Sequence, residues 1–192
     1  MDKFNIAFDI TMKYEGGYSN DPDDVGGETY KGISRKFNPN WPGWAIIDTM
    51  KTLPYKDFIQ QIDSSVMIQM SVKSLYKAKY WDIFLGDTLK SQSLANVLFD
   101  TAVNLGASRA VLFIQKGLNV LNRNATMWED LVEDGQFGNK THTVLSQLTV
   151  KDTDILVKII YILRGQHYID YMKKSPTQEK FARGWFNRIQ IN

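Results

Sequence analysis

Apolar side chains recur at helical spacing along most of the chain, and this pattern predicts a mainly α-helical protein. The first apolar stripe also carries Glu15, and the glycine pair at 16–17 is expected to end that helix. The stretch from about 55 to 80 is predicted to be helical, with an interruption near residues 64–65. The apolar members of the first stripe are Phe4, Ala7, Phe8 and Met12.

The clearest helical patterns lie in the second half of the chain. "SLANVLFDTAVNLG" keeps its large apolar residues on one face and ends at Gly106, and "SRAVLFIQKGLNVL" does the same directly afterwards. A loop follows, and Thr141 is expected to cap a helix that begins near His142. A long helix is predicted from residue 153 or 154 to about 173, with a short one in "TQEKFARGWFNRI". Strand signals are few, and the glycine-rich segment after Glu15 is the best place for a small hairpin.

Composition narrows the classes of chemistry that the chain could carry. Of its 192 residues, 43% are apolar, and the formal net charge is only +2. This low charge argues against a nucleic-acid binder, which usually carries a basic face. There are no cysteines and only two histidines, so thiol chemistry is excluded and a zinc site is not expected. We expect no cofactor and no metal, which leaves carboxylates, hydroxyls and amides.

The ends and apolar runs of the sequence give expectations about where the protein acts. No run approaches the roughly 18 apolar residues of a membrane span, and the N-terminus has no secretory apolar region. We therefore expect that the protein is synthesised in the cytoplasm and does not insert into a membrane. A protein that acts outside the cell would then need a holin or a similar route for release.

Glu15 is the first candidate catalytic residue. It lies on the apolar stripe of its helix and at the helix C-terminus, and both settings disfavour a negative charge on a carboxyl group. A carboxyl group that keeps its proton near neutral pH is what a glycosidase general acid needs. The alternative is an ordinary helix-end residue that points to water.

A cluster of carboxylates follows in "NDPDDVGGETY". Asp21, Asp23 and Asp24 lie in a loop, where a solvated carboxylate stays ionised. One protonated acid facing one ionised carboxylate forms the pair that hydrolyses glycosides. Thr29 and Tyr30 add hydroxyls that could hold a water nucleophile. A calcium loop and a solvated acidic turn are the alternatives, although the spacing differs from that of an EF-hand.

The segment "EGGYSNDPDDVGGETYKGIS" resembles the signature of the glycoside hydrolase 108 family of bacterial and phage N-acetylmuramidases. The matched positions run from Glu15 through Asp21, Asp24 and Thr29 to Gly32 and Ile33. "FDTAVNLG" is similar to the family's second helix motif. "EDGQFGNKT" and "GWFNR" resemble the associated C-terminal peptidoglycan-binding region, so the resemblance covers most of the chain.

The resemblance implies a mainly α, lysozyme-like fold with two lobes and at most a small β-hairpin. The lobes would be a catalytic one over residues 1–94 and a peptidoglycan-binding one over 95–192, packed as one body. The implied activity is hydrolysis of the β-1,4 bond between N-acetylmuramic acid and N-acetylglucosamine. The partners would be peptidoglycan glycan strands, without nucleic acid, and the protein would be a monomer. A lytic transglycosylase and a non-catalytic wall-binding or phage structural module are the alternatives.

The same resemblance implies roles for single residues. Glu15 would be the catalytic acid. The segment is also similar to phage-type lysozymes, which carry a Glu, an acidic residue nine positions later and then a Thr, and this second similarity implies that Asp24 and Thr29 complete the catalytic set. Thr29 lies fourteen residues after Glu15, one fewer than the usual phage-lysozyme spacing. Asn104 resembles an asparagine that faces the lysozyme cleft, although it could equally be a helix-end residue. The candidates for contact with the sugar are Tyr18, Asp21, Tyr30 and Asn104, with Tyr18, Trp41, Trp44 and Trp81 as aromatic stacking faces or, alternatively, as core residues.

Overall fold

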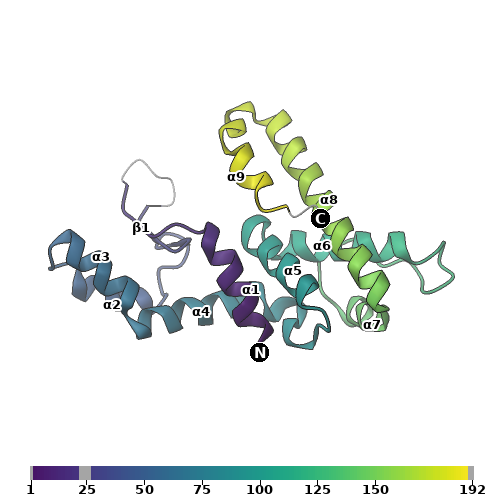
Figure 1. The fold of residues 1–192 in the computed structure, drawn as a ribbon, viewed down its shortest axis with the longest axis horizontal. Coiled ribbons are helices and arrows are strands. Elements are labelled where there is room, and N and C mark those ends of the chain that lie inside the picture. Colours follow the sequence, from purple (N-terminus) through teal and green to yellow (C-terminus); the bar gives the residue numbers. More distant parts are fainter. Residues whose placement is uncertain (1, 22–26, 190–192) are drawn as a thin grey trace. The chain divides into compact units, whose positions relative to one another are not determined.

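The computed structural model describes residues 2–21 and 27–189 (Figure 1). Within these ranges the chain is mainly α-helical and carries one small sheet. It divides into two compact units, an N-terminal unit of residues 8–79 and a C-terminal unit of residues 80–192 with residues 1–7. The first helix, α1 (Lys3–Thr11), supplies residues to both. The lobe boundary that we predict at residue 94 stays a prediction.

The N-terminal unit contains the sheet. A short 3-10 helix, η1 (Met12–Tyr14), continues α1, and three two-residue strands follow: β1 (Tyr18–Ser19), β2 (Thr29–Tyr30) and β3 (Ile33–Ser34). They pair antiparallel in the order β1-β2-β3. The glycine-rich segment therefore forms strands as predicted, and a third strand joins the two of a hairpin.

Three helices complete the N-terminal unit. They are α2 (Gly43–Met50), α3 (Tyr55–Ser64) and α4 (Val66–Tyr80). The predicted interruption is confirmed, because Ser65 is extended and its hydroxyl accepts a hydrogen bond from the N–H of Ile68, which caps α4. The sequence pattern did not predict α2, whose eight residues follow a loop rich in proline and asparagine.

Aromatic rings form the centre of the N-terminal unit. Trp41 packs edge-on against Trp44 with ring centroids 5.0 Å apart, and Tyr30 stacks beside Trp41 at 6.4 Å. Both indoles are buried, at 5% and 2% exposure, and each donates its N–H to a backbone carbonyl. These contacts favour the core alternative for Trp41 and Trp44, because a buried ring offers no face to a ligand.

The C-terminal unit is built on three helices that pack pairwise: α5 (Gln92–Leu105), α6 (Ala107–Leu121) and α8 (Val150–Lys174). A side chain at Gly117 would place its Cβ 2.3 Å from Leu156 Cδ1, so glycine lets α6 and α8 approach closely. The short 3-10 helices η2 (Asp82–Phe84) and η3 (Gly86–Thr88) precede α5. The predicted end of α5 at Gly106 is confirmed.

The loop after α6 is held by amide side chains of that helix. Buried Gln115 accepts from the N–H of Gly135 and donates to Asp134 and to the Gln136 carbonyl. Asn119 exchanges two hydrogen bonds with the backbone of Leu131. The loop is therefore fixed to α6 as a scaffold element.

The helix that follows this loop is α7 (Asn139–Gln147), and its N-cap residue is Gly138. The prediction that Thr141 caps it is wrong, because Thr141 lies buried inside the first turn. The helix therefore begins three residues earlier than His142.

The long helix α8 (Val150–Lys174) also begins earlier than the apolar pattern predicts. Thr149 caps α8 by accepting from the N–H of Asp152 and by donating its hydroxyl to the Asp152 carboxylate, so the helix starts at Val150. The chain then forms η4 (Pro176–Phe181) and α9 (Ala182–Phe186). No helix within the described part of the chain is long and apolar enough to cross a membrane.

Candidate active site

Glu15 is the first residue after the N-terminal helical segment. It is the C-cap of η1, with extended φ and ψ of −91° and 141°, and its N–H bonds to the Met12 carbonyl. Its side chain is half-buried. The helix end therefore presents a carboxyl group that is neither fully solvated nor enclosed, and its role as a general acid stays a prediction.

The turn between β2 and β3 lies against Glu15. Lys31 and Gly32 have φ of 46° and 75°, which is the two-residue type I′ pattern of a tight hairpin. A side chain at Gly32 would place its Cβ 2.8 Å from Glu15 Oε2 and 2.7 Å from the Tyr76 hydroxyl oxygen. Buried Tyr76, from α4, donates this hydroxyl to the Lys31 carbonyl at 2.7 Å. Glycine is thus required twice at this position, for the turn and for room beside Glu15.

The two neighbouring hydroxyl residues Thr29 and Tyr30 have different surroundings in the structure. Thr29 is half-buried and donates to the Gly27 carbonyl at 3.0 Å. Tyr30 is fully buried; it donates to Asp63 at 2.9 Å and accepts from Gln69 at 2.8 Å. Burial, followed by the contact with Asp63, raises the pKa of the Tyr30 hydroxyl. The prediction that Tyr30 binds substrate is therefore corrected to a core role.

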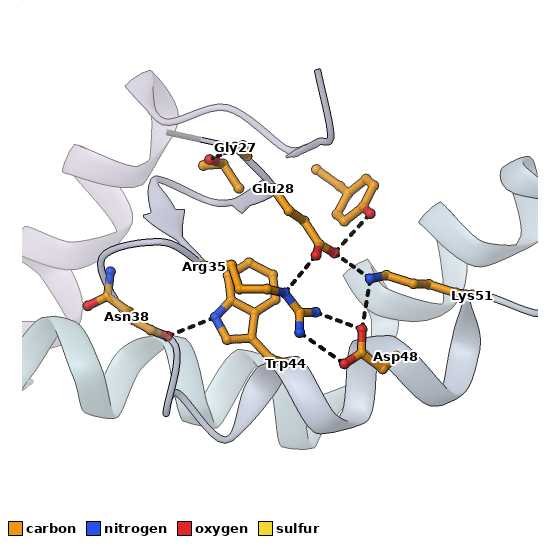
Figure 2. Close-up of polar contacts among 9 residues, drawn as sticks. Gly27, Glu28, Arg35, Asn38, Trp44, Asp48 and Lys51 are labelled. Atoms are coloured by element: carbon orange, nitrogen blue, oxygen red, sulfur yellow. Dashed lines mark hydrogen bonds and ion pairs between the residues drawn. The ribbon is translucent and has the colours of Figure 1, made fainter. Parts of the chain in front are cut away.

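Glu28, a carboxylate that the sequence pattern does not mark as a site residue, lies at the centre of a polar network in the N-terminal unit (Figure 2). It pairs with Arg35 at 2.6 Å and with Lys51 at 2.8 Å. Asp48 in α2 binds the same two cations at 2.6 and 2.7 Å, and the Tyr18 hydroxyl donates to Glu28 at 2.9 Å. The network ties β1 and the start of β2 to α2.

The network excludes two carboxyl groups, those of Glu28 and Asp48, as the catalytic acid. Partial burial of Glu28 opposes its ionisation, but the hydrogen bonds from Lys51 and Tyr18 and the two cationic charges lower its pKa. The bonds from Arg35 and Lys51 lower the pKa of Asp48 to about 2. Burial and the bond to Glu28 raise the pKa of Tyr18 to about 12. Glu28 and Asp48 are thus held ionised, and neither can donate a proton near neutral pH.

The remaining predicted residues of the N-terminal unit have different surroundings. Tyr18 is half-buried, with its ring edge-on to Phe58 at 4.8 Å, and its role in sugar binding stays a prediction. Asp21 is exposed. Asp24, like Asp23, lies outside the described residues.

Two predicted site residues lie in the C-terminal unit. Trp81 is fully buried among Phe4, Phe84 and Phe99, and its N–H donates to Asp87 at 2.9 Å. The prediction that it stacks on a sugar is corrected, because no face of the indole is open. Asn104, near the end of α5, is half-buried and accepts from the Tyr168 hydroxyl at 2.6 Å.

Comparison with known proteins agrees with this arrangement. The family model for glycosyl hydrolase 108 matches residues 8–106, and a second model, described as a predicted peptidoglycan domain, matches residues 109–190. The chain is similar in fold to a solved structure entitled "Structure of Brucella abortus SagA", with 21% identity, a TM-score of 0.58, and coverage of 97% of this chain and 88% of that one. A comparison with curated proteins finds no match.

These findings confirm the mainly α, lysozyme-like fold and the family that the sequence motifs predict. The first match contains Glu15 and the whole sheet, and the second contains most of α6 and the chain through α9, with the loop fixed by Gln115. Together they support a glycoside hydrolase that acts on peptidoglycan. The chain belongs to the glycosyl hydrolase 108 family.

Proposed function

We propose that this protein is an N-acetylmuramidase that hydrolyses the β-1,4 bond between N-acetylmuramic acid and N-acetylglucosamine. The observation that carries the proposal is the position of Glu15. It is half-buried directly after the first helical segment, it lies against the Lys31–Gly32 turn, and it falls inside the stretch that matches the family.

In this mechanism Glu15 gives its proton to the glycosidic oxygen as the bond breaks. Glu28 cannot take this role, because Arg35 and Lys51 hold it ionised and its side chain is only 10% exposed. Thr29 donates its proton to a backbone carbonyl, so its oxygen keeps lone pairs that can accept from a water nucleophile. The second carboxylate comes from the acidic segment, where Asp24 is the proposed residue.

The assignment of Asp24 predicts an order among three asparagine variants. Asp24→Asn should lose the most activity on cell-wall suspensions, by roughly 10²-fold or more, because the ionised partner of Glu15 is removed. Asp21→Asn and Asp23→Asn serve as matched controls in the same segment. If Asp24→Asn is the mildest of the three, the assignment is wrong and Asp21 replaces it. A calcium role would appear instead as activity lost to a chelator and restored by calcium.

The products released from purified peptidoglycan test the proposed reaction. We expect mass spectrometry to show soluble fragments that end in reducing N-acetylmuramic acid, since water is the acceptor. Fragments that end in the anhydro sugar would identify a lytic transglycosylase, which uses one acid and no second carboxylate. Binding to the wall without release of fragments would identify a non-catalytic module. The Glu15→Gln protein, treated in parallel, gives the background.

A further inference from the structure

The C-terminal unit contains an open groove of about 350 Å³ that the proposed reaction does not use. It lies between the end of α5, the start of α6, one face of α8 and α9. Its polar lining is formed by Asn104, Arg109 and His167, and its aromatic lining by Tyr168, Tyr171 and Trp185. Among the residues that the structure describes, no aspartate or glutamate lines it.

Arg109 gives the groove a positive charge. It is exposed and donates to His167 Nδ1 at 2.9 Å, and within residues 2–21 and 27–189 it has no carboxylate partner. Because Nδ1 accepts this bond, the neutral imidazole carries its proton on Nε2. Burial and the charge of Arg109 lower the pKa of His167, although Asp170 opposes this shift. At neutral pH the pair therefore offers a guanidinium and an N–H, both of which are donors.

A buried chain of hydrogen bonds orients Asn104 as a third donor. Arg164, fully buried and paired with Asp100 at 2.6 Å, can only donate, so the Tyr168 oxygen accepts from it at 3.2 Å. Tyr168 must then use its own proton for Asn104 Oδ1. This leaves the Asn104 Nδ2 group, which bonds to no residue in the described part of the chain, as a donor available to a ligand.

The aromatic lining gives the groove an apolar side. Tyr168 stacks on Trp185 at 5.3 Å, and His167 stacks on Tyr171 at 6.3 Å. Tyr171 is 44% exposed, so much of its surface remains open to a ligand. Three donors beside aromatic rings suit an acceptor-only, negatively charged group that carries small apolar substituents.

We propose that this groove binds a carboxylate of the peptide stem of peptidoglycan, with Arg109 and Asn104 as the donors and Tyr171 as the apolar contact. The peptide stem supplies both features, since it carries carboxylates and alanine methyl groups, whereas the glycan of a stem-bearing strand is uncharged, because the lactyl carboxyl group of N-acetylmuramic acid is bonded to the stem as an amide. The inference deepens the proposed function, because it takes the same polymer as ligand. It assigns a site for the peptide part of a substrate whose glycan bond is cut elsewhere.

Calorimetric titration of the full-length Glu15→Gln protein tests the site, because this variant is expected to leave the ligands uncut. The probes are a purified disaccharide tetrapeptide, the same compound with its carboxylates amidated, and a neutral disaccharide of N-acetylglucosamine. We expect the first probe to bind at least about tenfold more tightly than the other two. Arg109→Gln and Asn104→Asp should each weaken its binding at least tenfold, about 1.4 kcal/mol.

Asn104→Asp keeps the shape of the side chain and the acceptor for Tyr168, but it replaces the free donor with a charge that repels a carboxylate. Arg123→Gln is the matched control, because Arg123 is exposed and lies just beyond the other end of α6. If all three probes bind alike, if the first does not bind, or if Arg109→Gln behaves like Arg123→Gln, the proposal is overturned. Failure of the proposed reaction would appear separately, in the fragments that the wild-type protein releases.

Discussion

Glu15→Gln is expected to reduce the lysis of cell-wall suspensions by at least roughly 10²-fold while the protein stays folded. An amide cannot supply the proton that the leaving glycosidic oxygen needs. It has the same size as the carboxyl group, so it still fits against Gly32 and Tyr76. Turbidity loss measures the activity, and circular dichroism with thermal melting measures the fold.

Glu129→Gln gives the matched control for the charge change, since Glu129 is exposed in the loop after α6. It should keep wild-type activity. A folded Glu15→Gln protein with more than about a tenth of the wild-type activity would remove Glu15 from the role of general acid. The search for the proton donor would then turn to the acidic segment that begins at Asp21.

The sequence pattern predicts helices well where local signals agree. The apolar face of α5 and the glycine that follows it, and the serine pair that interrupts 55–80, are short-range features that the folded chain keeps. The position of Glu15 at a helix end is of the same kind. The starts of α7 and α8 were misplaced because the capping residues Gly138 and Thr149 precede the apolar pattern.

Burial of single aromatic residues could not be predicted in the same way. Tyr30 and Trp81 are buried because residues remote from them in sequence enclose them, such as Asp63 and Gln69 for Tyr30. An aromatic side chain with a polar tip suits a core or a cleft equally well, and only tertiary contacts decide. Isolated sequence positions therefore gave two wrong substrate contacts.

The Glu28 network could not be predicted from the sequence for a related reason. Glu28 pairs with Arg35, which follows β3, and with Lys51, which follows α2. The sequence pattern does not predict α2. Charged residues at these spacings are usually solvated, so nothing local marks them as partners. The groove of the C-terminal unit is also a tertiary feature, because Asn104 and Tyr168 meet across 64 positions.

Asp100→Ala is expected to destabilise the protein by about 3–5 kcal/mol, because it leaves a buried cation without its counter-charge. Asp100 pairs with Arg164 at 2.6 Å and with Arg188 at 3.2 Å, and the Arg164 side chain is fully buried. Nε and Nη1 of Arg164 already lack a hydrogen-bond acceptor among the described residues, so no other group can take over the charge. The melting temperature should fall by roughly 6–20 °C.

The double variant Asp100→Leu/Arg164→Met separates two contributions to the free energy of unfolding: the cost of leaving a buried charge unpaired, and the stabilisation by the ion pair itself. Removing both charges leaves apolar side chains between α5 and α8, although Arg188 still loses its contact with Asp100, so the double variant should recover part of the stability that Asp100→Ala loses. Denaturant unfolding followed by circular dichroism measures both proteins. A loss below about 1 kcal/mol in Asp100→Ala, or a double variant no more stable than the single one, contradicts this account. Because Arg164 also fixes the Tyr168 hydroxyl, the double variant should bind the disaccharide tetrapeptide more weakly even where its stability recovers.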